Sequence, residues 1–253
     1  MKQQKVSLVM ITKNCEDVIE KALKSVNSLV DEIVIVDDYS TDKTIKIAKK
    51  HEARIFSNTY EGEGQQRLFA LKKANNEWIL VLDSDEAISI KLKSEIKSIL
   101  KETYSYSGFI IPYQNYFLGK ALRFGGENYK KIRLFKQDKI SVDSKDVHAE
   151  YHVTSGEIGK LKNKILHYSY RSIPQVFKKF TDYALCEAKQ KSANGEKTNL
   201  KKMIFYPPHM FWARFIKDKG YKDGFFRVPL DLGFAYMEFL TYFSMIFIKK
   251  NKL

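Results

Sequence analysis

Short apolar runs alternate with amphipathic stretches through the first hundred residues of the chain. The runs are rich in valine and isoleucine and are bounded by polar turns, a pattern that predicts strands buried on both faces of a sheet. The stretches between them repeat apolar positions at helical spacing, so each can pack one face on that sheet. The predicted strands cover 6–11, 32–36, 54–56 and 78–82, and the predicted helices cover 18–29, the residues leading to Lys50, and 65–75. This alternation predicts a parallel sheet with right-handed crossovers.

The pattern changes beyond the fourth strand. An amphipathic helix with a lysine-rich outer face is predicted at 89–103, and a further strand at 108–112. We therefore expect an α/β fold with a mixed, mainly parallel sheet, helices on both of its faces and a helical C-terminal appendage. The expected main domain covers 1–195, with halves at 1–103 and 104–195, and the expected appendage covers 196–253.

Charge and cysteine content narrow the classes of partner and compartment. The 253 residues include 44 Lys and Arg against 30 Asp and Glu, a formal net charge of +14. Such an excess favours anionic partners: phosphorylated substrates, nucleic acid or an anionic membrane. Cys15 and Cys186 offer at most one disulfide and no metal-binding spacing, and the apolar run at 6–11 is too short for a signal peptide. We expect reduced thiols and a cytoplasmic location.

Three carboxylates follow directly after the strand at 78–82, in the stretch WILVLDSDE. Asp83, Asp85 and Glu86 repel one another at the end of a buried strand, so a structural role alone explains them poorly. Hard oxygen ligands suit Mg²⁺ or Mn²⁺, and open α/β sheets bind ligands at this edge. The alternative is a solvated turn in which Asp83 or Ser84 caps the next helix.

Four motifs along the first half of the chain form one set. They are SLVMITKN, EIVIVDDYSTD, the helix start at Gln66 and Arg67, and VLDSDE. Their order and spacing resemble those of family 2 glycosyltransferases, which have the nucleotide-sugar-binding fold called GT-A. The resemblance implies a UDP-sugar donor and a divalent cation, Mn²⁺ or Mg²⁺.

The same resemblance implies a role for each matched residue. Asp38 would hold the nucleobase, because a fixed carboxylate acceptor selects a ring that offers an N–H donor. Arg67 would lie near the base and the phosphates, where its planar guanidinium can bind an oxyanion. Without the motif set, Asp38 would better be explained as a helix cap and Arg67 as a surface arginine. The implied donor-binding residues are Ile11, Thr12, Asn14, Asp38, Arg67, Asp83 and Ser84, and the implied metal ligands are Asp83, Asp85 and His167.

The stretch NYFLGKALRFGGENYKKIRLF places paired glycines among aromatic and basic residues. Paired glycines allow a ligand to approach the backbone closely, and aromatic rings stack on sugars; an irregular hairpin is the alternative. This stretch, the Val147-His148 pair and the later His-Tyr-Ser-Tyr run resemble the subgroup that adds glucose to the heptose of the lipopolysaccharide inner core, with relatives in lipooligosaccharide and capsule assembly. The implied acceptor-binding residues are Gly125, Gly126 and Arg133.

The chain departs from that subgroup at one position. Where the subgroup usually has Val-His-Glu, this sequence has Val-His-Ala-Glu, so Ala149 aligns with the expected glutamate. An inverting transferase needs a base that takes the proton of the attacking hydroxyl. We assign Glu150 and His148 as the catalytic candidates, with Asp143 and Asp146 as alternatives.

The C-terminal segment interleaves basic and aromatic residues. From Lys197 to Leu253 there are eleven Lys and Arg against four Asp and Glu. This composition is typical of an interfacial membrane anchor. The apolar stretch at 228–248 contains two acids, each costing about 2.5–3.5 kcal/mol at mid-bilayer, so surface attachment or a subunit interface is favoured over a full span. A helical cover on the main domain is the alternative.

These observations lead to one hypothesis and two rivals. The hypothesis is a metal-dependent, inverting hexosyltransferase that uses UDP-glucose and a lipid-linked saccharide at the inner face of the cell membrane. A sugar nucleotidyltransferase is one rival, but ITKNCED lacks the glycine-rich phosphate loop that such enzymes carry. The other rival is a basic scaffold on membrane or nucleic acid, with a degenerate transferase site. No nucleic-acid recognition motif occurs, so nucleic acid is not an expected partner.

Overall fold

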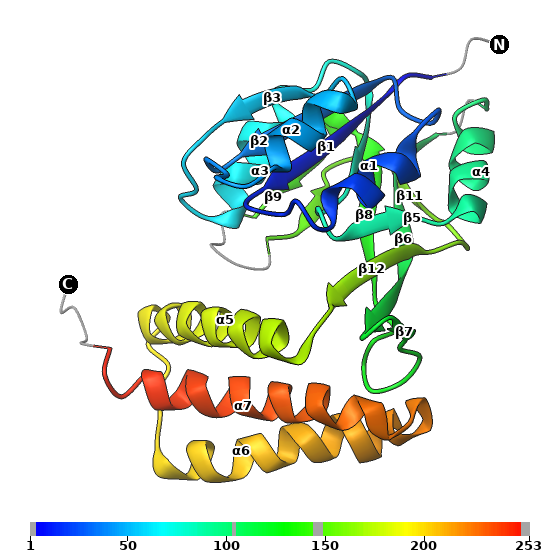
Figure 1. The fold of residues 1–253 in the computed structure, drawn as a ribbon. Coiled ribbons are helices and arrows are strands. Elements are labelled where there is room, and N and C mark those ends of the chain that lie inside the picture. Colours follow the sequence, from blue (N-terminus) through cyan, green and yellow to red (C-terminus); the bar gives the residue numbers. More distant parts are fainter. Residues whose placement is uncertain (1–3, 103–104, 144–148, 249–253) are drawn as a thin grey trace. The chain divides into compact units, whose positions relative to one another are not determined.

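The computed structural model describes residues 4–102, 105–143 and 149–248. The chain forms two compact units (Figure 1). The N-terminal unit comprises Met1–Gln114 and Tyr129–His167, and the C-terminal unit comprises Asn115–Asn128 and Tyr168–Leu253. The boundaries of these units differ from the boundary expected at residue 195. The helix that ends just before residue 195 packs with the C-terminal helices and therefore belongs to their unit.

The predicted parallel sheet is present in the N-terminal unit. Its first four strands are β1 (Val6–Thr12), β2 (Glu32–Asp37), β3 (Arg54–Ser57) and β4 (Trp78–Val81). They lie in the order β3-β2-β1-β4, and all pair in parallel. The carboxyl ends of these strands therefore lie along one edge of the sheet.

Beyond β4 most of the strand pairs are antiparallel. The order continues β8-β6-β12-β5, with β8 paired to both β4 and β6 and β12 paired to β5. The strand predicted at 108–112 is the middle of the longer β6. These strands are β5 (Glu86–Ile88), β6 (Tyr106–Phe117), β8 (Lys130–Lys136) and β12 (Ile165–Tyr170). The shorter β7 (Lys120–Ala121) and β11 (Glu157–Lys160) pair with β6, and β9 (Ile140–Val142) and β10 (Tyr151–Val153) form a separate two-stranded sheet. The mixed sheet expected from the sequence is thus confirmed.

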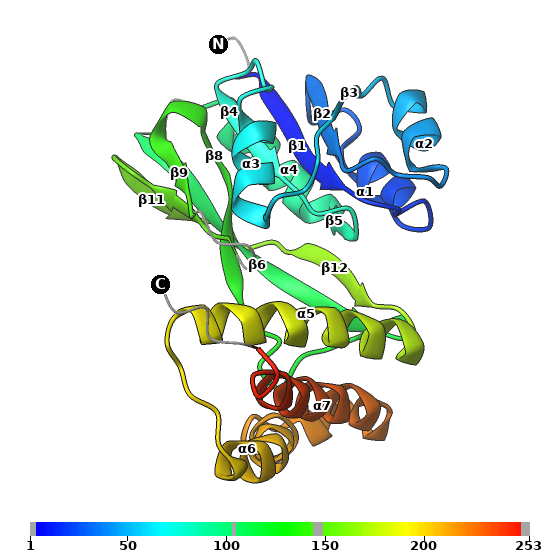
Figure 2. The same ribbon diagram turned by 90° about the vertical axis from the view of Figure 1, so that its left-hand side faces the viewer.

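Helices cover both faces of this sheet (Figure 2). Apolar side chains of α1, α2 and α4 join one core cluster, and those of α3 join a second cluster with the opposite strand faces. The helices are α1 (Ile19–Val26), α2 (Thr44–Lys50), α3 (Glu63–Leu71) and α4 (Ile90–Ile99), and a 3-10 turn covers Gln137–Lys139. Three of them end earlier than predicted, because apolar residues such as Leu29 are buried in the turns that follow.

The C-terminal unit is built from three long helices. They are α5 (Ile173–Ala193), α6 (Leu200–Trp212) and α7 (Val228–Ser244), with a π-helical turn at Ala213–Lys217 and 3-10 turns at Gly220–Asp223 and Phe225–Arg227. α7 packs against both α5 and α6 (Figure 1). Among the residues that the structure describes, none of the helices combines the length and the apolar character needed to cross a bilayer.

Candidate active site

A tight turn places the three acids after β4. The backbone N–H of Glu86 donates to the carbonyl of Asp83 (2.9 Å), and the N–H of Asp83 donates to the Glu86 carboxylate (3.0 Å). Glu86 then begins β5, where it pairs directly with His167 of β12. The turn is therefore fixed at both ends, and it presents Asp83 and Asp85 beside the antiparallel half of the sheet.

Asp83 is held by two arginines from different elements. Arg67 of α3 binds one carboxylate oxygen through Nη2 (3.2 Å), and Arg133 of β8 binds the other through Nη2 (2.8 Å). Partial burial raises the pKa of Asp83, but the two guanidinium groups outweigh that effect and hold its pKa well below the usual range. Asp83 is consequently an anion at neutral pH, neutralised by its arginines.

Glu86 completes this cluster in a deeper position. Its carboxylate contacts Nη2 of Arg133 (3.1 Å), and Nε of Arg133 donates to the hydroxyl of Tyr113 (2.5 Å). Burial raises the pKa of Glu86; Arg133 opposes this rise, and the negative charge of Asp83 adds to it. Nη1 of Arg133 is buried and has no hydrogen-bond partner within the described parts of the chain.

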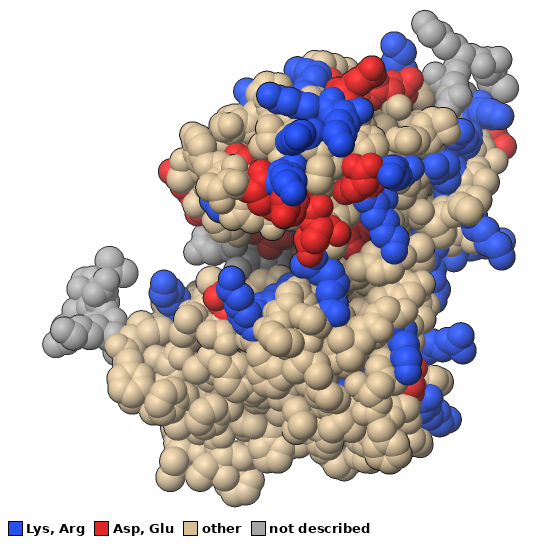
Figure 3. Space-filling view, viewed as in Figure 1, with Lys and Arg blue, Asp and Glu red and all other residues tan. Residues whose placement is uncertain are grey.

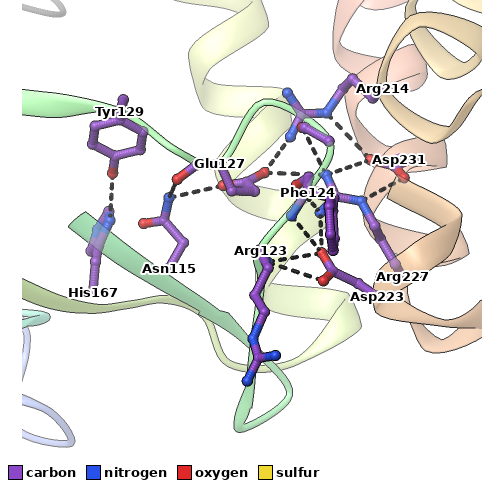
Figure 4. A network of polar contacts seen from close by, with 11 residues as sticks. Asn115, Arg123, Phe124, Glu127, Tyr129, His167, Arg214, Asp223, Arg227 and Asp231 are labelled. Carbon is purple, nitrogen blue, oxygen red and sulfur yellow. Dashed lines mark hydrogen bonds and ion pairs between the residues drawn. The ribbon is translucent and has the colours of Figure 1, made fainter. Parts of the chain in front are cut away.

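Asp85 lies against a histidine. Nε2 of His167 is 3.4 Å from a carboxylate oxygen of Asp85, and Nδ1 of the same ring is 2.9 Å from the hydroxyl of Tyr129. Figure 4 shows the Tyr129–His167 pair. A hydroxyl on one ring nitrogen fixes which nitrogen can act as a ligand, so Tyr129 orients His167 toward Asp85.

The neighbouring strand ends carry the residues expected at the nucleotide. The hydroxyl of Thr12 donates to Asp37 (2.8 Å), which also accepts from the backbone of Ser40 (2.7 Å), so Asp37 holds the two turns together. Asp38 is half-buried, forms an ion pair with Lys13 (3.1 Å) and accepts from a backbone N–H in the loop between β3 and α3 (3.2 Å). Of the two acids, Asp38 is the one with its carboxylate at the surface.

Asn14 and Ser84 link the turns that follow three of the strands. The side-chain oxygen of Asn14 accepts from the backbone of Thr41 (2.8 Å), so it joins the turns after β1 and β2. Burial raises the pKa of the Cys15 thiol, while hydrogen bonds with Thr44 and Ser84 oppose the rise. Cys15 thereby connects the turn after β1 to the turn after β4.

A cavity of about 210 Å³ adjoins the acidic cluster. Arg67 and Arg133 line it, together with Ala149 and Glu150. The N–H of Ala149 donates to Glu63 (3.2 Å), and Glu150 is exposed to solvent. Glu150 therefore lies at the mouth of a space large enough for a substrate group. His148, the other catalytic candidate, and Asp146 fall outside the described residues.

Fewer donors converge at the expected metal site than the sequence suggests. The residues at 4–102, 105–143 and 149–248 contain no group of three His, Cys, Asp or Glu side chains that could hold a metal ion by themselves. Asp83 turns both oxygens to arginines, whereas Asp85 and His167 lie together. An oxygen and a nitrogen donor fit Mn²⁺ or Mg²⁺ if further ligands come from a bound substrate.

Comparison with known proteins identifies the family. Residues 7–156 match the model of glycosyl transferase family 2, and this span includes the strand ends, the acidic turn and the cavity. The chain belongs to glycosyltransferase family 2.

Relatives of this transferase are found in several bacteria. An uncharacterized glycosyltransferase of Rickettsia typhi is 29% identical over 250 residues, covering 94% of this chain and 85% of the relative. A lipopolysaccharide core biosynthesis glycosyltransferase of Rhizobium meliloti, LpsC, is 25% identical over 229 residues, covering 87% and 83%. Among solved structures, glucosyl-3-phosphoglycerate synthase from Mycobacterium tuberculosis is similar in fold, with a TM-score of 0.50, 16% identity and coverage of 78% and 82%.

The paired glycines of the transferase belong to its C-terminal unit. Both have positive φ angles, and a Cβ atom on Gly125 would overlap the guanidinium of Arg227. Arg227 donates to the carbonyl of Gly125 (2.9 Å) and pairs with Asp231 through two nitrogens (2.8 and 3.1 Å; Figure 4). The structure thus explains glycine at position 125 by packing within this unit, without a ligand. Binding of an acceptor by Gly125 and Gly126 stays a prediction.

Several residues of the site were not found by sequence reasoning. They are Glu63, Tyr113, Tyr129 and Tyr151, which bind Arg67, Arg133 or His167. Of these, only Glu63 could have been predicted from the sequence, because it precedes Arg67 by four residues and so lies on the same face of the helix. The tyrosines reach the site from segments that are distant along the chain, which leaves no local signature in the sequence.

Proposed function

We propose that this family 2 transferase is an inverting, metal-dependent hexosyltransferase. It moves glucose from UDP-glucose to a lipid-linked saccharide in lipopolysaccharide, lipooligosaccharide or capsule assembly. The Rhizobium meliloti relative LpsC, a glycosyltransferase of lipopolysaccharide core biosynthesis, supports the pathway class at 25% identity. The acidic turn and the neighbouring strand ends support the donor chemistry.

One observation carries the donor assignment. β2 and β4 flank β1 on its two sides, and all three strands run parallel. Adjacent strands lie about 4.8 Å apart, so the turns that bear Asp38 and Asp85 follow strands only about 10 Å apart at the same sheet edge. A nucleoside diphosphate can reach from one turn to the other. Asp38 accepts the N–H of the base, and the diphosphate extends toward Asp85.

Asp85 and His167 would hold the cation, with Tyr129 orienting the histidine. A bound Mn²⁺ or Mg²⁺ supplies positive charge that stabilises the departing diphosphate. Asp83 would remain paired with Arg67 and Arg133, where it keeps the two guanidinium groups in place beside the donor. The arginines also supply positive charge near the phosphates.

Glu150 is the general base in this proposal. Its carboxylate takes the proton of an acceptor hydroxyl as the hydroxyl oxygen forms a bond to the anomeric carbon. The bond from that carbon to the diphosphate breaks, and UDP leaves with the electron pair. The attack comes from the face opposite the leaving group, which inverts the anomeric centre.

Thermal unfolding with nucleotides tests the donor assignment. UDP with Mn²⁺, at about 100 times its Kd, should raise the melting temperature by about 5–10 °C. ADP should stabilise much less, because its base offers a different pattern of donors. Asp38→Asn should remove the preference for UDP. Equal stabilisation by UDP and ADP, or none by either, would reject the assignment.

Hydrolysis of a panel of UDP-sugars by the wild-type protein then identifies the sugar.

Membrane attachment through the C-terminal unit belongs to the same proposal. On the face in Figure 3 the surface over α6 and α7 carries few charged side chains. Many large apolar side chains are exposed in the segment 200–243: Leu200, Ile204, Phe205, Trp212, Ile216, Tyr221, Phe225, Phe239 and Phe243. Two acids of this segment, Asp223 and Asp231, are buried against Arg227. The surface of this segment is therefore apolar and basic, as an anionic bilayer surface requires.

Vesicle binding by two matched variants tests this attachment. Phe225 is 86% exposed in the C-terminal unit, and Ile90 is 85% exposed in the N-terminal unit. Phe225→Ser should weaken binding to vesicles containing phosphatidylglycerol about tenfold, because one aromatic side chain no longer enters the bilayer. Ile90→Ser should bind as the wild type does. Equal binding by the two variants, or a concentration-dependent dimer in place of vesicle binding, would contradict attachment.

A further inference from the structure

The cavity beside the acidic cluster has a strongly basic lining. Lys130 and Lys131 of β8 lie on its wall together with Arg67 and Arg133. Ile110 and Ile132 supply apolar surface, and Glu150 is the one acidic residue among the described lining residues. The lining therefore combines a sugar-compatible apolar surface with an excess of positive charge.

The basic residues that line this cavity differ in whether they form ion pairs within the protein. Arg67 is paired with Glu63 and Asp83, so its charge is largely neutralised within the protein. Neither Lys130 nor Lys131 forms an ion pair within 4–102, 105–143 and 149–248. Lys131 is half-buried, and its ammonium group lies over the ring of Tyr129, 5.7 Å from the centroid. Two lysine charges are thus available to a ligand.

Arg133 adds an independent observation. It is 2% exposed, yet its Nη1 has no hydrogen-bond partner among the described residues. Leaving a buried guanidinium N–H without an acceptor is unfavourable, and proteins avoid it unless water or a ligand supplies one. The unpaired nitrogen can therefore donate to an acceptor atom that does not belong to the described residues, such as one from a ligand.

We propose that this cavity binds an anionic group, a phosphate or a carboxylate, on the acceptor saccharide. The inference rests on the proposed transferase function, because it assigns the acceptor side of that site. Lys130 and Lys131 bind the anion, and Nη1 of Arg133 supplies a further donor. With Glu150 in the same wall, the anionic group positions a neighbouring hydroxyl for deprotonation. The acceptor is thus an acidic sugar, and a neutral sugar lacks the group that holds it.

The cavity volume agrees with a compact ligand group. At about 210 Å³ it is smaller than the 300–1,000 Å³ of typical small-molecule pockets. It can hold one charged unit of a saccharide, while the rest of the acceptor extends into solvent. A monosaccharide that carries one anionic group is therefore an adequate probe.

Binding of three monosaccharides tests the proposal. Glucose 6-phosphate, glucuronate and glucose are titrated into the full-length protein by calorimetry, with and without saturating UDP and Mn²⁺. At least one of the two acidic sugars should bind about tenfold or more tightly than glucose, and which one does so identifies phosphate or carboxylate. UDP should not displace it.

Two double variants give the matched comparison. Lys130→Gln with Lys131→Gln should remove the preference for the acidic sugar, bringing its Kd to within about threefold of that of glucose. Lys136→Gln with Lys139→Gln changes the same number of charges in the adjacent part of the chain, outside the cavity lining, and should keep the preference.

Three results would overturn the proposal. Glucose could bind as tightly as the acidic sugars, the preference could persist in the Lys130→Gln, Lys131→Gln variant, or UDP could compete with the acidic sugars. Competition would assign the basic wall to the diphosphate of the donor. Failure of UDP to bind while acidic sugars still bind would reject the proposed function and leave the anion site in place, so the two failures are distinguishable.

Discussion

Each unit of the molecule contains a buried arginine surrounded by carboxylates, and the two arginines differ in how fully they are paired. Arg227 in the C-terminal unit has partners on all three nitrogens: Asp231, Asp223, Glu127 and the carbonyls of Phe124 and Gly125. Arg133 in the N-terminal unit binds Asp83, Glu86 and Tyr113 but leaves Nη1 unpaired among the described residues. A buried arginine with a partner on every nitrogen is typical of a structural role. A buried arginine that lines a cavity and has a donor without a partner is typical of a binding site.

The surroundings of the two arginines differ in the same sense. Arg227 ties a glycine-containing loop to the start of α7, so its partners are largely backbone groups and helix residues (Figure 4). Arg133 lies among acids whose pKa values are shifted in opposite directions, downward for Asp83 and upward for Glu86. Opposed shifts among neighbouring acids are common where a site binds charged ligands. We therefore expect substitutions around Arg227 to change stability and those around Arg133 and His167 to change activity.

The largest expected effect is on stability, from Arg227→Met. The substitution leaves Asp231 and Asp223 buried with less positive charge, and breaking such a pair lowers the free energy of unfolding by about 3–5 kcal/mol. Urea denaturation measures this change. Arg123→Met is the matched control, because this arginine is in the contacting loop but exposed, and it should change stability by less than about 0.5 kcal/mol. If the two variants lowered stability equally, the structural role assigned to Arg227 would be wrong.

The next effect separates two glycines with similar backbone angles. Gly125 and Gly119 have φ of +67° and +76°, so alanine at either position is strained by about 1–2 kcal/mol. At Gly125 the new methyl group also overlaps Arg227, which adds about 1–3 kcal/mol, whereas nothing lies within 4 Å at Gly119. Denaturation curves should therefore show Gly125→Ala to be the less stable variant. The reverse order would exclude close packing on Arg227.

In the N-terminal unit, Asp85→Ala tests the other half of the comparison. The free energy of unfolding should change by less than about 1 kcal/mol, because the side chain of Asp85 is only partly buried. Mn²⁺-dependent turnover with a UDP-sugar should fall by about 100-fold or more, since charge stabilisation in the transition state is lost. Asp138→Ala, an exposed acid in the same unit, is the control. An active, metal-indifferent Asp85→Ala enzyme would overturn the metal assignment.

The smallest effect concerns the residue that orients His167. Tyr129→Phe removes the hydroxyl next to Nδ1 and should weaken Mn²⁺ binding in the presence of UDP about tenfold, with little change in stability. Calorimetric titration of Mn²⁺ measures this directly. Tyr221→Phe, at an exposed tyrosine, should bind as the wild type does. Unchanged affinity in Tyr129→Phe would mean that the histidine is not a ligand.

Local patterns predicted the parallel half of the sheet and the residues at its edge. Apolar runs and polar turns are local features, so β1, β2 and β4 and the acids that follow β2 and β4 could be located without a structure. Helix ends were less accurate. Leu29 continues the apolar spacing of α1, but it is buried from a turn after the helix has ended at Val26.

The rest of the site depends on strand pairing between distant segments. Arg133 reaches Asp83 because β8 inserts next to β4, and His167 reaches Asp85 because β12 pairs with β5. The sequence contains no local pattern from which the pairing of β8 with β4 or of β12 with β5 could be predicted. The Arg227–Asp231 pair did have a local signal, since the two residues are four apart on a helix, but the apolar composition around them obscured it.

The two cysteines differ in accessibility. Cys15 is 6% exposed, and burial raises the pKa of its thiol, whereas Cys186 on α5 is exposed. A maleimide reagent at neutral pH should therefore react at Cys186 well before Cys15. The natural chain thus accepts a single fluorophore on its C-terminal unit, so its arrival at a lipid surface can be followed by energy transfer without any engineered residue.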